Sequence, residues 1–386
     1  MNREGMNHAT VRRRNRGLIL RLVAGGRCSS RVELARESGL TKMSITNIVG
    51  ELMEAGYLVE SGEAARMSMA GRSPMALQIS ADAPKLAGVT LRRTHCSAVL
   101  CDLRLNVLKS AELPWKDLNE VTMTQTICRL LDEVMEGAGK VAGIGVGVVG
   151  QVDGRTGTMV RTPDFFGIEN YPIRRVLEER YGLPVTVDNR TCAAAAGELY
   201  YGVGHSYQDF IYLEILNGIG SASVSAGEIV HNDLGNGPEL GHISIQYHGR
   251  PCSCGNYGCL ERYAGGDAVS ERVFLETGER LTMQQICKRS YQPFYDQVLC
   301  EEVDYLAAAL VSLLNAFHPT VVVLGFDNCE LPDRYYEMLE QEINKRKYMR
   351  DFYHCRILKP CLGDLGEVRG CAAMVAGRLF AGELMD

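Results

Sequence analysis

The sequence predicts an α/β protein in which a small N-terminal domain of three helices and two strands precedes a larger domain that contains a metal-binding loop. Three observations support this prediction. The N-terminal segment 1–80 contains 12 Lys and Arg against 7 Asp and Glu, a net charge of +5, which leaves −11 for the rest of the chain. Helical periodicity dominates residues 11–53, and three cysteines lie close together at 252–259. With 386 residues, 46% of them hydrophobic, the chain is long enough for two or three domains.

Composition narrows the classes of protein. The sequence contains no run of about 18 apolar residues, so we expect no membrane span. The arginine-rich N-terminus lacks the apolar stretch of a signal peptide, and we expect a cytoplasmic protein. In such a chain, 14 cysteines are typical of buried thiols and a metal site rather than of a disulfide framework. The basic N-terminal part favours a nucleic acid as partner, because Lys and Arg supply many of the contacts with phosphate.

Three helices are predicted before the first strand. Apolar residues recur at helical spacing over 11–23 and over 31–38, and Gly39 is suited to end the second helix in the left-handed conformation. Thr41 can cap a third helix, because its hydroxyl can accept a hydrogen bond from the first turn. In that helix Ile45, Ile48, Val49, Leu52 and Met53 form the apolar stripe expected to face a core.

The exposed face of the third helix and a following hairpin predict a winged helix-turn-helix. Side chains able to reach phosphates and base edges in a major groove are those of Lys42, Ser44, Thr46 and Asn47. Two strands over 56–59 and 75–79 enclose a loop whose glycine turn presents Arg72, a shape suited to a minor groove. An ordinary solvated helix face and a hairpin tip in water would give the same residues, so both interpretations stay open.

A compact cluster of one histidine and three cysteines predicts a metal site. The residues are His242, Cys252, Cys254 and Cys259, with Gly255 and Gly258 between the last two cysteines. Four such ligands fill the tetrahedral coordination of Zn²⁺ and leave no open position, which is typical of a structural site. The alternative is three buried thiols near an unrelated histidine.

These motifs resemble the ROK family (repressors, open reading frames and kinases), and in particular its xylose and N-acetylglucosamine repressor-like branch. The N-terminal matches are Leu34-Ala35, Gly39-Leu40-Thr41-Lys42 and Gly71-Arg72, and the later ones are Glu239-Leu240-Gly241-His242 and the stretch from Cys252 to Glu261. The resemblance implies a winged helix-turn-helix over 1–82. It also implies a two-lobed, actin-like (ribonuclease H-like) domain over 83–386, with a break between lobes near 190–200.

The resemblance also implies a sugar site. In sugar-binding members of the family, the first glutamate, the histidine and the last glutamate of the motif contact sugar hydroxyls. The corresponding residues of this chain are Glu239, His242 and Glu261. Asn189 is implied in the same pocket. We expect one ring nitrogen of His242 on the metal and the other facing the pocket. Alternatively, the two glutamates only support the zinc loop.

Three departures from the family's kinases fall on catalytic positions. The kinases begin with an Asp-x-Gly-Gly-Thr phosphate loop, where this chain has Thr90-Leu91-Arg92-Arg93-Thr94. The general base of an Asn-Asp pair is replaced, since Asn189 is followed by Arg190, whose guanidinium cannot accept a proton. The paired glycines on the nucleotide side are here Gly325-Phe326. We therefore expect no ATP-dependent phosphorylation and no enzyme activity.

The predicted function is a DNA-binding transcriptional regulator, in particular a repressor of carbohydrate-related genes. The expected effector is a sugar or sugar derivative, and Arg190 would suit a phosphorylated or acidic sugar. The expected partners are double-stranded operator DNA and further copies of the chain in a homodimer or tetramer. Two alternatives remain: a sugar kinase with a DNA-binding head, and a regulator without a small ligand that responds to a protein partner.

Overall fold

The computed structural model describes residues 7–61, 76–161, 165–326 and 331–385. Contacts divide the chain into two compact units. Unit 1 comprises residues 1–205 and 365–386, and unit 2 comprises residues 206–364. The predicted domain boundary at 82/83 lies within unit 1 and stays a prediction.

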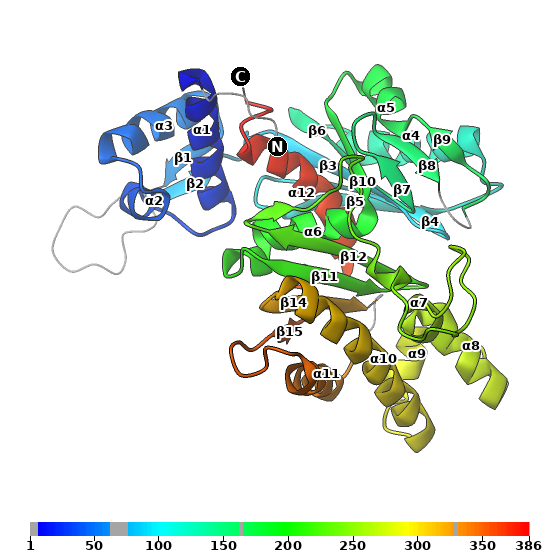
Figure 1. Cartoon of the computed structure of the whole chain (residues 1–386). Helices are drawn as coiled ribbons and strands as arrows, with labels where there is room; N and C mark the ends of the chain where they lie inside the picture. Colours follow the sequence, from blue (N-terminus) through cyan, green and yellow to red (C-terminus); the bar gives the residue numbers. More distant parts are fainter. Residues whose placement is uncertain (1–6, 62–75, 162–164, 327–330, 386) are drawn as a thin grey trace. The chain divides into compact units, whose positions relative to one another are not determined.

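Residues 7–61 and 76–79 of unit 1 form a small domain, here called the head (Figure 1). Its elements are α1 (His8–Ala24), α2 (Arg31–Ser38), α3 (Lys42–Glu54), β1 (Leu58–Ser61) and β2 (Ala76–Ile79). The predicted signals bound the helices: Gly39 ends α2 with φ of 70°, and Thr41 caps α3 by accepting a hydrogen bond from Ser44 N. β1 and β2 pair antiparallel, with Leu58 opposite Ile79. Residues 62–75, including Arg72, lie outside the described part of the chain.

The rest of unit 1 is built on a five-stranded mixed sheet with the order β10-β6-β3-β4-β5. Its strands are β3 (Lys85–Leu91), β4 (His95–Cys101), β5 (Val107–Pro114), β6 (Val141–Val148) and β10 (Val185–Asn189). Its helices are α4 (Glu120–Met135), α5 (Ile173–Tyr181), α6 (Arg190–Tyr201) and α12 (Gly366–Phe380), with a short helix η2 (Val203–His205). A second, three-stranded sheet contains β7 (Gln151–Asp153), β8 (Thr158–Arg161) and β9 (Glu169–Tyr171).

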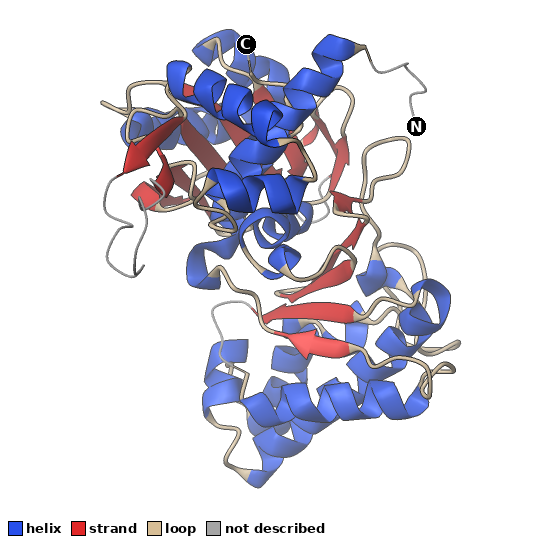
Figure 2. Cartoon of the chain, turned by 90° about the vertical axis from the view of Figure 1, so that its left-hand side faces the viewer, coloured by secondary structure: helices blue, strands red, loops and turns tan. Residues whose placement is uncertain are grey.

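Unit 2 contains a second five-stranded mixed sheet, with the order β13-β12-β11-β14-β15. The strands are β11 (Phe210–Ile215), β12 (Ile219–Ser225), β13 (Glu228–Ile229), β14 (Val321–Phe326) and β15 (Arg356–Leu358). The helices are α7 (Glu261–Ala264), α8 (Gly266–Thr277), α9 (Met283–Lys288), α10 (Pro293–Phe317) and α11 (Asp333–Arg346), with the short helix η3 (Leu240–His242). The short helix η4 (Gly363–Leu365) contains the point at which the chain returns to unit 1. Apolar residues of α10 and α11 pack with those of β11 and β14 in one buried core. Figure 2 shows helices beside the strands of the sheet.

The two large sheets have the same topology. In each, the first three strands form an antiparallel meander, the fourth strand pairs parallel with the first, and the fifth pairs parallel with the fourth. This repetition confirms the predicted α/β fold of two related lobes preceded by a helical N-terminal domain. Within the described ranges, no helix combines the length and the apolar character that a membrane span requires.

Helix α1 of the head packs against the end of α12 inside unit 1. A Cβ atom at Gly17 would lie 2.1 Å from the carbonyl oxygen of Phe380, so the close approach of the two helices requires glycine there. Nearby, the guanidinium of Arg21 lies 5.1 Å from the centre of the Tyr200 ring. The head is therefore held against α12 by close packing of the helix backbones and against α6 by the contact between Arg21 and Tyr200, in addition to its covalent connection.

Candidate functional site

The N-terminal turn of α3 presents an exposed polar face. Lys42, Thr46 and Asn47 are exposed, while Ile45, Ile48, Val49 and Leu52 are buried as predicted. Met43 is also largely exposed on this face, at 77%. The face thus combines a cation, an amide and a thioether.

Two of the predicted contact residues already make hydrogen bonds within α3. The hydroxyl of Ser44 lies 2.9 Å from that of Thr41 in the cap, and Ser44 is only partly exposed. The hydroxyl of Thr46 donates to the carbonyl oxygen of Lys42 at 2.9 Å. Lys42 and Asn47 are therefore the better candidates for contacts beyond the helix.

Two of the N-terminal arginines tie α1 to α3. Arg12 forms an ion pair with Glu51 at 2.5 Å, and Arg16 lies 3.7 Å from the same carboxylate. Their charge is partly neutralised within the head. The local sequence did not reveal this arrangement, because Glu51 belongs to a different helix, far along the chain from both arginines.

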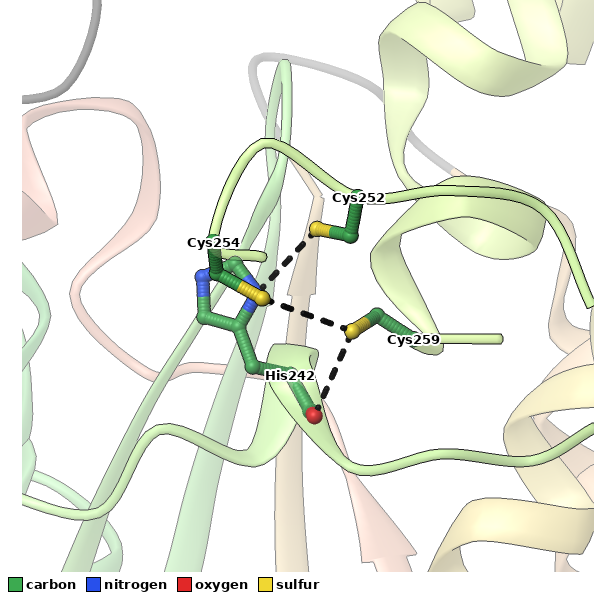
Figure 3. Close-up of side chains that lie close together, drawn as sticks. All are labelled: His242, Cys252, Cys254 and Cys259. Atoms are coloured by element: carbon green, nitrogen blue, oxygen red, sulfur yellow. Dashed lines mark hydrogen bonds between the residues drawn. The ribbon is translucent and has the colours of Figure 1, made fainter. Parts of the chain in front are cut away.

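The histidine and the three cysteines come together in unit 2 as predicted (Figure 3). Their ligand atoms all lie within 4.8 Å of one another. Nδ1 of His242 is 3.6 Å from Sγ of Cys252, and Sγ of Cys254 is 3.7 Å from Sγ of Cys259. Zn–S bonds of about 2.3 Å in a tetrahedral site place two sulfur atoms about 3.8 Å apart, so the donor set and its spacing fit zinc.

Tight backbone turns bring these ligands together. Gly255 and Gly258 have φ of 93° and 70°, backbone conformations that residues with a side chain rarely adopt. A Cβ atom at Gly258 would also lie 1.8 Å from the carbonyl oxygen of Gln246. Cys259 pairs with Ser244 in an isolated bridge, which holds the last cysteine beside η3 and His242.

The thiols of the cluster differ in acidity. Burial raises the pKa of Cys259 to about 12, and hydrogen bonds with Cys254 and Cys252 contribute to this increase. For Cys254, burial raises the pKa, but hydrogen bonds from the Asn256 backbone and from the neighbouring thiols outweigh it and lower the pKa. A metal ion that binds thiolates would replace the shared protons, so its affinity would fall in acid.

The predicted sugar-contacting residues of unit 2 lie around η3. Glu239 directly precedes η3 and His242 ends it. The pKa of Glu239 is raised mainly because surrounding protein atoms displace water from its carboxyl; the charge of His242 lowers it and that of Glu261 raises it. The residue as a whole is nevertheless exposed. A backbone hydrogen bond from Leu260 N–H to the carbonyl oxygen of Ile243, at 2.9 Å, brings the start of α7, with Glu261, beside the end of η3.

Glu261 has a defined position at the start of α7. One of its carboxylate oxygens accepts a hydrogen bond from the backbone N–H of Ile219 at 3.1 Å. A Cβ atom at Gly218 would lie 2.0 Å from that oxygen. The strand β12 therefore fixes the carboxylate from one side.

Asn189 and Arg190 belong to unit 1, at the junction of β10 and α6. Oδ1 of Asn189 caps α6 by accepting a hydrogen bond from Thr191 N at 2.8 Å, and Nδ2 donates to the carbonyl oxygen of Gly150 at 2.9 Å. Asn189 thus has a structural role whatever it binds. The adjacent Asp188 is buried and accepts the N–H of Asn189.

Two of the arginines at departures from the kinase pattern meet at one carboxylate. Arg92 donates to Glu367 from Nε at 2.7 Å and from Nη2 at 2.5 Å, and Arg190 donates from Nη1 at 3.1 Å. Glu367 lies at the start of α12 and is 5% exposed. The sequence analysis missed Glu367, because 177 residues separate it from Arg190. The side chain of Phe326, at the third departure, lies outside the described part of the structure.

A cavity of about 90 Å³ in unit 2 is lined by none of the predicted effector residues. Its walls come from the zinc loop, α7, α8 and α10. The lining residues are Arg250, Tyr263, Ala268, Val269, Arg272, Val298, Glu301, Glu302 and Tyr305.

Comparison with known proteins places the chain among regulators and kinases of one family. The ROK family profile matches residues 86–378. The xylose repressor of Caldicellulosiruptor bescii is 28% identical and covers 97% of this chain and 98% of its own length. The crystal structure of a ROK family transcriptional regulator, a homologue of the E. coli Mlc protein, superposes with a TM-score of 0.81 at 24% identity, covering 97% of this chain and 98% of its own.

The ROK hexokinase from Thermus thermophilus superposes with a TM-score of 0.64 at 28% identity, over 75% of this chain and 97% of its own. The two regulators thus match nearly the whole chain, and the hexokinase matches three quarters of it. Because the profile spans well over half of the sequence, the chain belongs to the ROK family, as its motifs predicted.

Proposed function

We propose that the chain is a DNA-binding transcriptional regulator, in particular a repressor of carbohydrate-related genes. The observation that supports this most directly is the head, in which a short glycine-ended helix leads into the capped helix α3 with Lys42 and Asn47 exposed. This is the arrangement in which a second helix enters a major groove. Relatives that match nearly the whole chain have names such as xylose repressor.

The proposed regulator does not phosphorylate sugar. Arg190 stands where the kinases have their base, and a guanidinium cannot accept a proton from a hydroxyl. Its contact with Glu367, which Arg92 shares, gives the departures from the kinase pattern a structural role of their own. In this chain, residues at two of the kinases' catalytic positions form a salt-bridge cluster instead.

The proposed effector is a sugar or a sugar derivative. Glu239 and His242 flank η3, and a backbone hydrogen bond between Leu260 and Ile243 holds Glu261 beside it. Carboxylates and an imidazole are suited to hydrogen bonds with hydroxyls. In this proposal, Nδ1 of His242 binds the zinc ion, because it is the nitrogen that faces Cys252. Nε2 is then available to the sugar.

Zinc has a structural role in the proposed regulator. The four ligands His242, Cys252, Cys254 and Cys259 fill its coordination, so no position is left for a reactive water. The ion would hold η3, and with it Glu239 and His242, in a fixed position. Residues of the effector site and of the metal site then depend on each other.

A homodimer or tetramer would place two heads on a symmetrical operator. Helix-turn-helix dimers read half-sites about 34 Å apart, one turn of the DNA helix. The two heads would have one arrangement that fits the operator and another that does not. An effector would change the DNA affinity by binding one of these arrangements more tightly than the other.

Selection of binding sequences from a random DNA pool by the zinc-loaded full-length protein tests the proposal. We expect a pseudo-palindromic site with half-sites about one helical turn apart. Lys42→Ala should weaken binding to all sequences and lower the salt slope by about 1, whereas Asn47→Ala should cost about 1–3 kcal/mol of discrimination at one base pair.

The control is Lys345→Ala, which removes an exposed lysine of α11 in unit 2. This variant should bind DNA like the parent protein. If the pool yields no enriched sequence, or if Lys42→Ala behaves like Lys345→Ala, the head does not read DNA through α3 and the proposed function is wrong.

A further inference from the structure

The cavity of unit 2 is small and has an apolar side. Its volume is about 90 Å³, that of about three water molecules in the liquid, whereas pockets for drug-sized ligands measure about 300–1,000 Å³. Ala268, Val269 and Val298 form the apolar side, on α8 and α10. Because a void of about 150 Å³ can hold benzene, this cavity suits a ligand of at most about six non-hydrogen atoms.

Two of the charged side chains that line the cavity neutralise each other. Arg272 of α8 donates to the carboxylate of Glu301 of α10 through Nη1 and, at 3.1 Å, through Nη2. Glu301 also accepts a hydrogen bond from Gln297 at 3.0 Å, and Nε of Arg272 lies 3.5 Å from the carboxylate of Glu276. The pair is therefore held on both sides by the protein and borders the cavity as a fixed, neutral group.

Arg250 is a cation of the cavity that has no acidic partner among the described residues. Its Nη1 donates to the carbonyl oxygen of Arg262 at 2.9 Å, and its guanidinium lies 4.8 Å from the centre of the Tyr263 ring. Its backbone N–H donates to the hydroxyl of Tyr263 at 2.8 Å, so the same tyrosine contacts both ends of the arginine. A guanidinium has five N–H donors in a fixed plane, so Arg250 can still bind both oxygen atoms of a carboxylate.

Glu302 adds a buried negative charge to the wall. It lies on α10 and is 3% exposed. A buried carboxylate is stabilised by positive charge and by hydrogen bonds to its oxygen atoms. An ionised carboxylate has about four acceptor sites, so Glu302 can accept hydrogen bonds from a ligand in addition to the contacts that it makes within the protein. The cavity thus offers a guanidinium and a carboxylate to one small ligand.

We propose that this cavity binds a small zwitterion, an α-amino acid such as glycine or alanine, with its carboxylate on Arg250 and its ammonium group on Glu302. The inference goes beyond the proposed function, because it adds a second ligand to unit 2. A zwitterion brings an opposite charge to each of the two side chains and leaves the cavity neutral. An anion brings one only to Arg250, a cation only to Glu302, and a polyol to neither.

Calorimetric titration of the zinc-loaded full-length protein at pH 7 and constant ionic strength tests the proposal. The probes are glycine and L-alanine as zwitterions, acetate as an anion, ethanolamine as a cation and glycerol as a polyol. We expect a zwitterion to bind about tenfold or more tightly than each of the other three classes, because each of these loses at least one hydrogen bond between charged groups.

Variants of the two proposed contact residues locate the site. Arg250→Gln and Glu302→Gln should each lose about tenfold or more of the affinity for the zwitterion. The matched control is Arg280→Gln, because Arg280 is also an exposed arginine of unit 2 and its guanidinium lies 4.3 Å from the centre of an aromatic ring, that of Phe274. This control should bind the zwitterion like the parent protein. Zinc content and circular dichroism show which variants fold, and the exposed position of Arg250 makes Arg250→Gln decisive even where Glu302→Gln fails to fold.

The proposal is overturned if no zwitterion binds, if acetate, ethanolamine or glycerol binds as tightly as glycine and alanine, or if folded Arg250→Gln binds them like the parent protein. The same protein preparations are also tested on the selected DNA site. Intact DNA binding without zwitterion binding would remove this inference and leave the proposed function standing, whereas zwitterion binding without DNA binding would do the reverse.

Discussion

At the scale of single residues, the buried carboxylate of Glu367 holds the side chains of Arg92 and Arg190 together in unit 1. Burial raises the pKa of its carboxyl, but the charges of Arg190 and Arg92 and their hydrogen bonds outweigh burial and lower it below the ordinary value of 4.5. The ionised form is therefore the one that the folded protein stabilises. A neutral side chain at this position would leave two guanidinium groups without their shared partner.

Glu367→Gln should lower the free energy of unfolding by about 3 kcal/mol at neutral pH, the lower end of the cost of breaking a buried ion pair. Because the folded pKa lies below the unfolded one, this contribution is complete above pH 4.5 and disappears as the pH falls through the folded pKa. Urea unfolding of both proteins between pH 7 and pH 3 should show the two curves converging in acid.

The control is Glu179→Gln, because Glu179 is 71% exposed and its only ion pair among the described residues is with the exposed Arg175. Its effect should stay within about 0.5 kcal/mol at every pH. A constant difference between Glu367→Gln and the parent across the whole pH range would show that ionisation of Glu367 does not contribute to stability.

At the scale of elements, the sequence predicts what local signals determine. The bounds of α2 and the start of α3 follow from Gly39 and Thr41, and the metal cluster follows from ligands that lie close together in the sequence, between His242 and Cys259. The three-stranded sheet of β7, β8 and β9 was not predicted, because strands of three or four residues show too little periodicity. The two-lobed organisation of the larger domain was implied by the family resemblance rather than by the pattern of residues, and the strand order of the sheets was not predicted.

The zinc loop is an element whose stability depends on its ion. Cys259→Ser should abolish stoichiometric zinc, measured by mass spectrometry of the metal, and should lower Tm by about 5 °C or more. A chelator should lower the Tm of the parent protein similarly. Cys361→Ser, which changes an exposed thiol outside the cluster, should leave both the zinc content and Tm unchanged. Zinc retained at one ion per chain in Cys259→Ser would mean that this cysteine is not a ligand.

At the scale of the whole molecule, the basic head is joined to the rest of unit 1 both by the chain and by the contact between α1 and α12. Helix α12 contains Glu367 in its first turn and ends at Phe380, against Gly17 of α1. Its 15 residues span about 22 Å. One rigid helix therefore connects the arginine cluster with the first helix of the head, and both lie in unit 1.

An effector that shifts α12 should therefore act on the head directly. We expect the proposed sugar effector to change the affinity for the selected DNA site by about 5- to 150-fold, and DNA to change the affinity for the effector by the same factor, because coupling is reciprocal. Gly17→Ala places a Cβ atom 2.1 Å from a backbone oxygen, which α1 can avoid only by moving off α12. This variant should keep both affinities measurable but reduce the coupling factor towards one.

Gly50→Ala is the matched control, because a Cβ atom there meets nothing within 4 Å. Fluorescence anisotropy of labelled DNA with and without the sugar measures the factor, and full coupling in Gly17→Ala would show that the contact between α1 and α12 does not transmit the signal.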